Sequence, residues 1–189
     1  MTQPTPSPFQ PAAVNAEHEA WLKGYIRDIP DYPQAGILFR DITPLLQNTE
    51  ALHFVIEALA NRYRDAQIDQ VVGIESRGFI FGTPLAYVLG TGFVPVRKKG
   101  KLPGQTISIE YDLEYGSNVL EIHTDAVRPG QRVLVVDDLL ATGGTTAGTL
   151  RLVESLGAHV VSFAFLVELT ALGGRDRLGG QDVFALLSY

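Results

Sequence analysis

Two adjacent carboxylates and a turn of small residues are the part of this sequence that most clearly suggests chemistry. Asp137 and Asp138 follow the apolar run 133–136, and the glycine turn, residues 141–145, comes shortly after them. Glycines let the backbone approach a ligand closely, and free N–H groups at the start of a helix bind anions. Carboxylates accept hydrogen bonds from vicinal hydroxyls. The pattern therefore predicts a site for a phosphate monoester that also carries a diol.

A plainer interpretation of the same stretch is an ordinary strand-to-helix connection, with glycines for geometry and aspartates for solubility. The position favours a ligand site, because open α/β sheets bind ligands at the carboxyl ends of their strands. The stretch lacks the G-x-x-x-x-G-K-[ST] lysine of nucleoside triphosphatases and the G-x-G-x-x-G pattern of dinucleotide folds. Those two classes of phosphate site are therefore not predicted.

The elements around this site follow from the apolar pattern. The run 133–136 is apolar on both faces, which is typical of a buried parallel strand, and we expect the two carboxylates to end it. Apolar residues at helical spacing predict helices over 49–66 and 146–156. Further buried strands are predicted at 71–74, 93–96, 160–167 and 183–187. These elements indicate an α/β fold with a mainly parallel sheet.

A second strand-to-helix turn carries charge. Glu75, Ser76 and Arg77 follow the strand predicted at 71–74 and precede a helix that begins near Phe79. Because the carboxyl ends of parallel strands meet at one edge of a sheet, we expect this turn to lie beside the glycine turn. Arg77 could hold an anion there in a bidentate manner, or it could be a solvated arginine behind an N-cap serine. Both interpretations stay open from the residues alone.

A run of cations follows the strand predicted at 93–96. The basic loop, residues 97–101, has four Lys or Arg in five positions within a chain of net charge −6. Such a run is usually a solvated loop, but its place after a buried strand, with glycine and proline hinges, favours a polyanion site. Alternating apolar and polar residues predict an antiparallel pair at 106–111 and 119–123. Residues 98–118 would then form a flexible β-hairpin lid.

The two ends of the chain are less informative. Residues 1–11 hold four prolines and are expected to be a disordered tail, and a helix is predicted over 12–29, ending before the next proline. Arg40 and Asp41 are adjacent, and we interpret them as a surface salt bridge. Four glycines within 173–180 are expected to loosen the link between the last two strands.

Composition bounds the class of protein. The chain has 189 residues, 46% of them hydrophobic, which is room for one domain, expected at 12–189, with a substantial core. Its net charge of −6 argues against nucleic acid as the main partner. The absence of cysteine excludes disulfides, thiolate metal sites and a catalytic Cys. There is neither a secretory signal pattern nor a run of about 18 apolar residues, so we expect a soluble cytoplasmic protein without a membrane partner.

The stretch V-L-V-V-D-D-L-L-A-T-G-G-T-T at 133–146 resembles the phosphoribosyl diphosphate (PRPP) motif of the type I phosphoribosyltransferases. The resemblance implies a central, mainly parallel twisted sheet flanked by helices, with a flexible hairpin lid and a small base-binding hood. It assigns the ribose hydroxyls to Asp137 and Asp138. It assigns the 5′-phosphate of PRPP to the glycine turn, that is, to Ala141, Thr142, Gly143, Gly144 and Thr145.

From about Ile29 onward the sequence is similar, within this family, to the adenine-specific members. The similar stretches are A-G-I-L-F-R-D-I-T-P at 35–44, E-S-R-G-F-I-F-G at 75–82, R-K-K-G-K-L-P-G at 97–104, L-E-Y-G at 113–116 and V-E-L-T at 167–170. The resemblance implies an adenine pocket lined by Leu38, Phe39, Arg40 and Leu139.

The same resemblance implies roles at the other end of PRPP. Diphosphate is assigned to six residues of the second turn and the basic loop: Glu75, Ser76, Arg77, Arg97, Lys98 and Lys101. The family has a non-proline cis peptide in the second turn, between Glu75 and Ser76. Glu114 would lie near the purine N7 for proton transfer, and Tyr115 would cover the site. Mg²⁺ is expected to be carried by PRPP without a dedicated site in the protein, and a homodimer is expected.

The reaction that the resemblance implies displaces diphosphate from C1 of ribose through an oxocarbenium-like transition state, comparable to glycoside cleavage. The residues predicted to act in catalysis are Glu114, Asp137, Asp138 and Arg77. Ala141 stands where the 6-oxopurine enzymes carry an Asp for proton transfer, which favours adenine and leaves Glu114 as the candidate acid or base. The expected substrates are adenine and PRPP, and the products are AMP and diphosphate. The alternatives are another purine or pyrimidine phosphoribosyltransferase and a PRPP-sensing regulatory protein.

Overall fold

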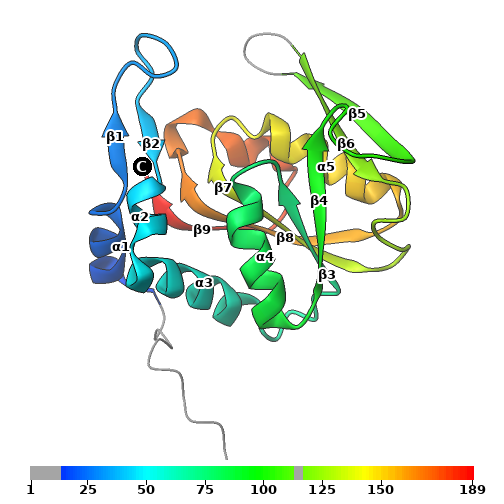
Figure 1. The fold of residues 1–189 in the computed structure, drawn as a ribbon, viewed down its shortest axis with the longest axis horizontal. Helices are drawn as coiled ribbons and strands as arrows, with labels where there is room; N and C mark the ends of the chain where they lie inside the picture. The colour runs from blue at the N-terminus through cyan, green and yellow to red at the C-terminus, as the bar shows by residue number, and fades with distance from the viewer. Residues whose placement is uncertain (1–13, 113–116) are drawn as a thin grey trace, which may run out of the picture. The chain divides into compact units, whose positions relative to one another are not determined.

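The computed structural model describes residues 14–112 and 117–189 (Figure 1). The chain forms two compact units, Met1–Asn61 and Arg62–Tyr189, and each is described by itself. The proline-rich segment 1–11 lies outside the described residues, so its disorder stays a prediction, as does the single domain from 12 to 189. Within the described residues no helix is both long and apolar enough to cross a membrane.

The first unit contains short elements joined by an antiparallel strand pair. In chain order they are α1 (Ala16–Lys23), β1 (Arg27–Ile29), β2 (Phe39–Asp41), α2 (Thr43–Gln47) and α3 (Thr49–Tyr63), the last of which reaches into the second unit. The helix predicted over 12–29 is wrong at its carboxyl end, because α1 ends at Lys23 and Gly24 is its C-cap. Residues 27–29 instead pair with β2, and this ladder outweighs the local helical spacing.

The strand pair also corrects the salt bridge predicted between Arg40 and Asp41. Neighbouring residues of a strand point to opposite faces, so these two side chains cannot meet. Each pairs across the ladder instead: Arg27 Nη2 lies 2.5 Å from Asp41 Oδ2, and Arg40 pairs with Asp28. Hydrogen bonds from Thr43, then from Arg27, lower the pKa of Asp41 to about 2.

The second unit is built on one seven-stranded sheet with the order β5-β6-β4-β3-β7-β8-β9. Its strands are β3 (Gln70–Ile74), β4 (Gly92–Lys98), β5 (Thr106–Asp112), β6 (Ser117–His123), β7 (Arg132–Leu140), β8 (His159–Glu168) and β9 (Val183–Ser188). Strands β4, β3, β7, β8 and β9 run parallel, while β6 is antiparallel to both of its neighbours. The predicted strands and the hairpin pair are therefore confirmed, and so is the α/β class.

Two helices cover opposite faces of this sheet, α4 (Gly78–Leu89) and α5 (Gly144–Ser155). Side chains alternate along β3, so Gly73 faces α4 and Val72 faces the cluster that contains Leu152 of α5. At Gly73 an added Cβ would lie 2.6 Å from the Phe93 ring, so the absence of a side chain lets this face close. Figure 1 shows α4 (green) in front of the sheet and α5 (yellow to orange) behind it.

The strand that carries the acidic pair is longer than predicted. We expected Asp137 and Asp138 to end it, but β7 continues to Leu140, because Leu139 and Leu140 still pair with Val167 and Glu168 of β8. The two carboxylates therefore project from a strand in ladder register and not from a loop. The following helix α5 begins at Gly144, two residues earlier than expected.

Candidate active site

The predicted convergence of two strand ends is present in the second unit. Strands β3 and β7 are parallel neighbours with Gly73 opposite Val136, so the turn after β3 lies beside the acidic pair of β7. Arg77 Nε lies 2.9 Å from Asp138 Oδ2. The peptide between Glu75 and Ser76 is cis, as the resemblance implies.

The acidic pair is desolvated and only partly compensated. Asp138 is 3% exposed, and Asp137 Oδ1 accepts a hydrogen bond of 2.9 Å from the Asp138 backbone N–H. Burial raises the pKa of both carboxyls. The negative charge of Asp138 raises the pKa of Asp137 further, and the Arg77 guanidinium opposes the rise at Asp138. Keeping these carboxylates ionised away from water costs folding free energy, and perturbed carboxyl pKa values of this kind are typical of functional sites.

One oxygen of the pair has an unfilled acceptor position. Among the described residues no donor meets Asp138 Oδ2 with hydrogen-bond geometry, although Arg77 Nε is close to it. Buried polar atoms in folded proteins nearly always have a hydrogen-bond partner. A hydroxyl donor on a ligand would complete this one.

The glycine turn is shaped by backbone packing. Gly143 is the N-cap of α5 with φ 81°, in the left-handed region, and it is buried together with Gly144. A Cβ on Gly143 would lie 2.4 Å from the Gly174 carbonyl oxygen, and a Cβ on Gly174 would lie 2.3 Å from the Ala141 carbonyl oxygen. The turn and Gly174 therefore pack backbone against backbone, and neither position has room for a side chain.

Gly174 is a site residue that sequence reasoning missed. We expected the glycines of 173–180 to loosen a link, but this segment forms two 3₁₀ helices, Thr170–Leu172 and Gly174–Leu178. Arg175, next to Gly174, binds the buried Glu168 with both nitrogens of its fork, Nε to Oε1 at 2.7 Å and Nη2 to Oε2 at 2.6 Å. Hydrogen bonding to Glu168 raises the pKa of Arg175. The segment between β8 and β9 is therefore firmly held. The only sequence signal for this is that charged residues stand next to its glycines.

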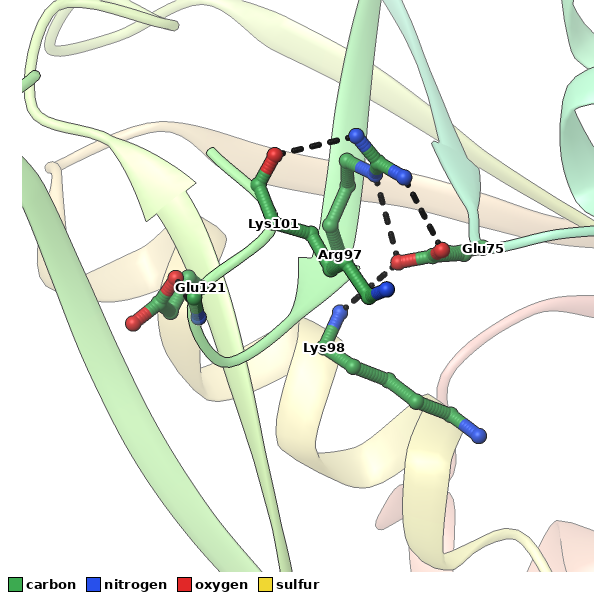
Figure 2. A network of polar contacts seen from close by, with 6 residues as sticks. Glu75, Arg97, Lys98, Lys101 and Glu121 are labelled. Carbon is green, nitrogen blue, oxygen red and sulfur yellow. Dashed lines mark hydrogen bonds and ion pairs between the residues drawn. The ribbon is translucent and has the colours of Figure 1, made fainter. Parts of the chain in front are cut away.

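The basic loop is tied to the second turn by one carboxylate, as Figure 2 shows. Arg97 donates from Nε to Glu75 Oε2 at 3.2 Å and from Nη2 to Oε1 at 3.0 Å, and the Lys98 backbone N–H donates to Oε2 at 3.0 Å. The hydrogen bond from Arg97 is the main cause that lowers the pKa of Glu75. Arg97 Nη1 also donates to the Lys101 carbonyl oxygen at 3.0 Å. The guanidinium is thus engaged within the protein, while the Lys98 side chain extends away from Glu75.

A second carboxylate holds the tip of the basic loop. Glu121 of β6 is 7% exposed and accepts a hydrogen bond of 2.9 Å from the Gly100 backbone N–H. Lys98 and Lys101 are exposed. The loop backbone is fixed, and its lysines are available to an anion.

The remaining predicted residues are not brought together by what the structure describes. Glu114 and Tyr115 lie outside the described residues, so their roles and the flexibility of the lid stay predictions. The residues assigned to adenine belong to two units: Leu38, Phe39 and Arg40 to the first and Leu139 to the second. Leu38 is 44% exposed and Leu139 is half-buried.

Comparison with known proteins agrees with this geometry. The model of the phosphoribosyl transferase domain matches residues 41–181. The adenine phosphoribosyltransferases of Carboxydothermus hydrogenoformans and Acaryochloris marina are each 60% identical over 168 residues, which are 89% of this chain and 99% of each relative. The chain belongs to the adenine phosphoribosyltransferase family.

Solved structures of the family share the fold. The adenine phosphoribosyltransferase of Thermoanaerobacter pseudethanolicus has a TM-score of 0.88 at 55% identity, covering 90% of this chain and 99% of that one. The Saccharomyces cerevisiae adenine phosphoribosyltransferase, solved with adenine and an imino-altritol bisphosphate, has a TM-score of 0.87 at 43% identity, covering 92% of this chain and 100% of that one. Type I phosphoribosyltransferase architecture is therefore confirmed.

Proposed function

We propose that this protein transfers the phosphoribosyl group of PRPP to adenine, forming AMP and diphosphate in purine salvage. The observation that carries the proposal is the acidic pair of β7, half-buried Asp137 and buried Asp138, shortly before the glycine turn, in a chain 60% identical to an adenine phosphoribosyltransferase. In the reaction, adenine N9 bonds to C1 of ribose while the bond from C1 to the diphosphate oxygen breaks. The electron pair leaves with diphosphate, and the purine ring loses one proton.

The ribose and its phosphate are assigned to β7 and the glycine turn. Positive charge develops at C1 in an oxocarbenium-like transition state. Asp137 and Asp138 would accept hydrogen bonds from the ribose hydroxyls and place negative charge near that carbon. The unfilled acceptor position on Asp138 Oδ2 supports this role. The backbone N–H groups at the start of α5 suit a phosphate dianion, because they have no partner within the helix.

Diphosphate is assigned to the second turn and the basic loop. Arg77, Lys98 and Lys101 would hold the leaving group and stabilise the charge that it gains. Arg97 is assigned to diphosphate by resemblance, and its pairing with Glu75 supports a role in shaping the loop as well. Glu75 and Ser76 would contribute through the backbone of their turn.

Mg²⁺ is part of the proposal. Among the described residues no group of three or more His, Asp or Glu could hold a metal ion, and Mg²⁺ commonly binds substrate phosphates with one or two protein carboxylates. Asp137 and Asp138 fit that limited share of the ligands. When bound on PRPP, Mg²⁺ would neutralise diphosphate and make it a better leaving group.

Base selectivity is assigned from Ala141 and from the resemblance. The Ala141 side chain cannot ionise, so it cannot exchange a proton with a 6-oxopurine. Glu114 would then take part in proton transfer at N7, with Tyr115 covering the site and Leu38, Phe39, Arg40 and Leu139 contacting adenine.

An assay of purine bases with PRPP and Mg²⁺ tests the function. We expect AMP formation from adenine with kcat/KM at least about 100-fold above that for hypoxanthine, guanine or orotate, because a site built to hydrogen-bond one base strongly rejects another. Equal or better turnover of another base would reject adenine specificity. Binding of PRPP without turnover of any base would instead support a PRPP-sensing regulator.

The assembly and location are further parts of the proposal. We assign a homodimer in the cytoplasm from the family resemblance. Light scattering behind size-exclusion chromatography tests the first point, and a monomer mass at assay concentration would reject it. Cell fractionation tests the second.

A further inference from the structure

A hydrogen bond joins the glycine turn to the hairpin strand β5. The Thr145 hydroxyl donates to the Tyr111 hydroxyl oxygen at 3.3 Å. Thr145 is half-buried, and Tyr111 is 7% exposed. A polar contact between these two elements is unexpected from the sequence, because Tyr111 lies far from the PRPP motif in the chain.

The Tyr111 ring is held against α5 by close packing. An added Cβ on Gly148 would lie 3.4 Å from Tyr111 Cβ and Cγ, so the helix presents a bare surface to the ring. Thr145 is anchored as well, since its carbonyl oxygen accepts a hydrogen bond of 3.0 Å from the Thr149 hydroxyl. Both hydroxyls are therefore placed by elements that do not depend on their mutual bond.

We propose that Tyr111 is a positioning residue for the 5′-phosphate and acts through Thr145. This inference rests on the proposed function, in which Thr145 is one of the residues that bind that phosphate. A phosphate dianion has no proton to donate, so the Thr145 hydroxyl must donate to it. The Thr145 oxygen then needs a donor, and the Tyr111 hydroxyl can rotate its own proton into that bond. The result is a chain in which Tyr111 donates to Thr145 and Thr145 donates to phosphate.

Such a chain strengthens phosphate binding in two ways. Hydrogen bonds in series polarise one another, so the Thr145 hydroxyl becomes a better donor. The hydrogen bond to the Tyr111 hydroxyl also restricts the Thr145 side chain to one rotamer, which lowers the ordering cost on binding. Both effects require the phosphate, and neither acts on adenine or on ribose alone.

The test compares ligands that differ only in the phosphate. Dissociation constants for AMP and adenosine are measured by calorimetry for the wild-type protein and for Tyr111→Phe, which keeps the packed ring and removes the hydroxyl. We expect AMP to bind about 3- to 10-fold more weakly, the range of one net hydrogen bond, with adenosine binding unchanged. Tyr63→Phe is the matched control, because it removes another buried tyrosine hydroxyl that is not part of the glycine turn. The Tyr63 hydroxyl is hydrogen-bonded to the Ser162 hydroxyl at 2.8 Å.

A double-mutant cycle identifies the route. Thr145→Val removes the hydroxyl, and Tyr111→Phe on that background should then change AMP affinity by less than about 1.5-fold, because the chain is already broken. Thr145→Ser keeps a hydroxyl and should keep the sensitivity to Tyr111→Phe. Additive losses, or equal weakening of AMP and adenosine, would overturn the inference and leave Tyr111 a packing residue. Wild-type protein that binds AMP no better than adenosine would instead reject the phosphate site of the proposed function.

Discussion

The glycine turn and the basic loop lie in the same unit and are both assigned to anions, yet they are held in opposite ways. The glycine turn has no charged side chain, its glycines are buried, and Gly143 packs against the backbone of Gly174. The basic loop is exposed from 98 to 101, and the carboxylates of Glu75 and Glu121 hold its backbone. One segment is shaped by contact and the other by charge.

The difference predicts how each segment responds to change. The energy of van der Waals contacts changes steeply with distance, so one added methyl group should displace the glycine turn. Salt and pH should hardly affect these contacts. The energy of charge pairs near the surface changes slowly with distance and is weakened by solvent and salt. The basic loop should therefore tolerate substitution and respond to pH. Gly174→Ala and Glu75→Gln test this comparison, and Asp137→Asn tests the acidic pair that precedes the glycine turn.

Gly174→Ala should have the largest effect. Its Cβ would lie 2.3 Å from the Ala141 carbonyl oxygen, so the glycine turn must move, and a shift of about 1 Å at a substrate site can cost about 100-fold in kcat/KM for PRPP. Steady-state kinetics with varied PRPP measure it. In Gly179→Ala, the control, φ is +58° but no atom lies within 4 Å, so we expect a loss of about 1–2 kcal/mol in stability without a kinetic change. If Gly174→Ala had the same KM for PRPP as the wild type, close packing would not be what shapes the glycine turn.

Asp137→Asn should lower activity to an intermediate degree but raise the stability of the fold. Loss of a charged acceptor for a ribose hydroxyl costs about 1.5–2 kcal/mol, or about 10- to 30-fold in kcat/KM. Because burial raises the pKa of Asp137, its ionised form destabilises the fold, and the amide removes that penalty. The melting temperature of the variant should therefore exceed that of the wild type at pH 7.

The pH dependence of the difference in melting temperature between variant and wild type tests whether burial of the Asp137 charge causes it. A raised carboxyl pKa means that the wild type loses stability as pH rises above the ordinary value of 3.8 towards the folded value. The melting difference should grow from acid to neutral pH in differential scanning calorimetry. A variant that melts lower than the wild type throughout would contradict the desolvation argument.

Glu75→Gln should have the smallest effect. The Arg97 pair is partly exposed, so its loss costs about 1 kcal/mol, or about fivefold in KM for diphosphate in the reverse reaction. Because the folded pKa of Glu75 is lowered, its stabilisation is complete above the ordinary pKa of 4.5 and is lost as pH falls through the folded value. The stability gap between wild type and variant should shrink below pH 4.5 and also in about 0.5 M salt.

The matched control for Glu75→Gln is Glu154→Gln, at an exposed position of α5. It removes the same charge away from the basic loop, so we expect no change in the reverse reaction. A loss of 100-fold or more in Glu75→Gln would show that charge shapes the basic loop as strictly as packing shapes the glycine turn, and the contrast would disappear.

Much of the fold was predictable because the relevant signals are local. Runs such as 71–74 and 133–136 are apolar on both faces, and only a sheet with two covered faces buries such runs. The closeness of the second turn to the acidic pair was predicted because parallel strands end at one edge, although the pairing of Arg77 with Asp138 itself was not. The errors came where a distant partner decided: β1 replaced the end of a predicted helix because β2 was available to pair with it.

The sequence by itself determined which chemical groups stand at the carboxyl edge of the sheet, since strand order along the chain places an acidic pair, a glycine turn and a basic loop there. Only the tertiary structure decided what holds them. Gly174 packs on the glycine turn, Tyr111 bonds to Thr145, and Glu75 engages Arg97. Local patterns report how each residue relates to its chain neighbours. Contacts between remote segments depend on the path of the whole backbone, which no local pattern contains.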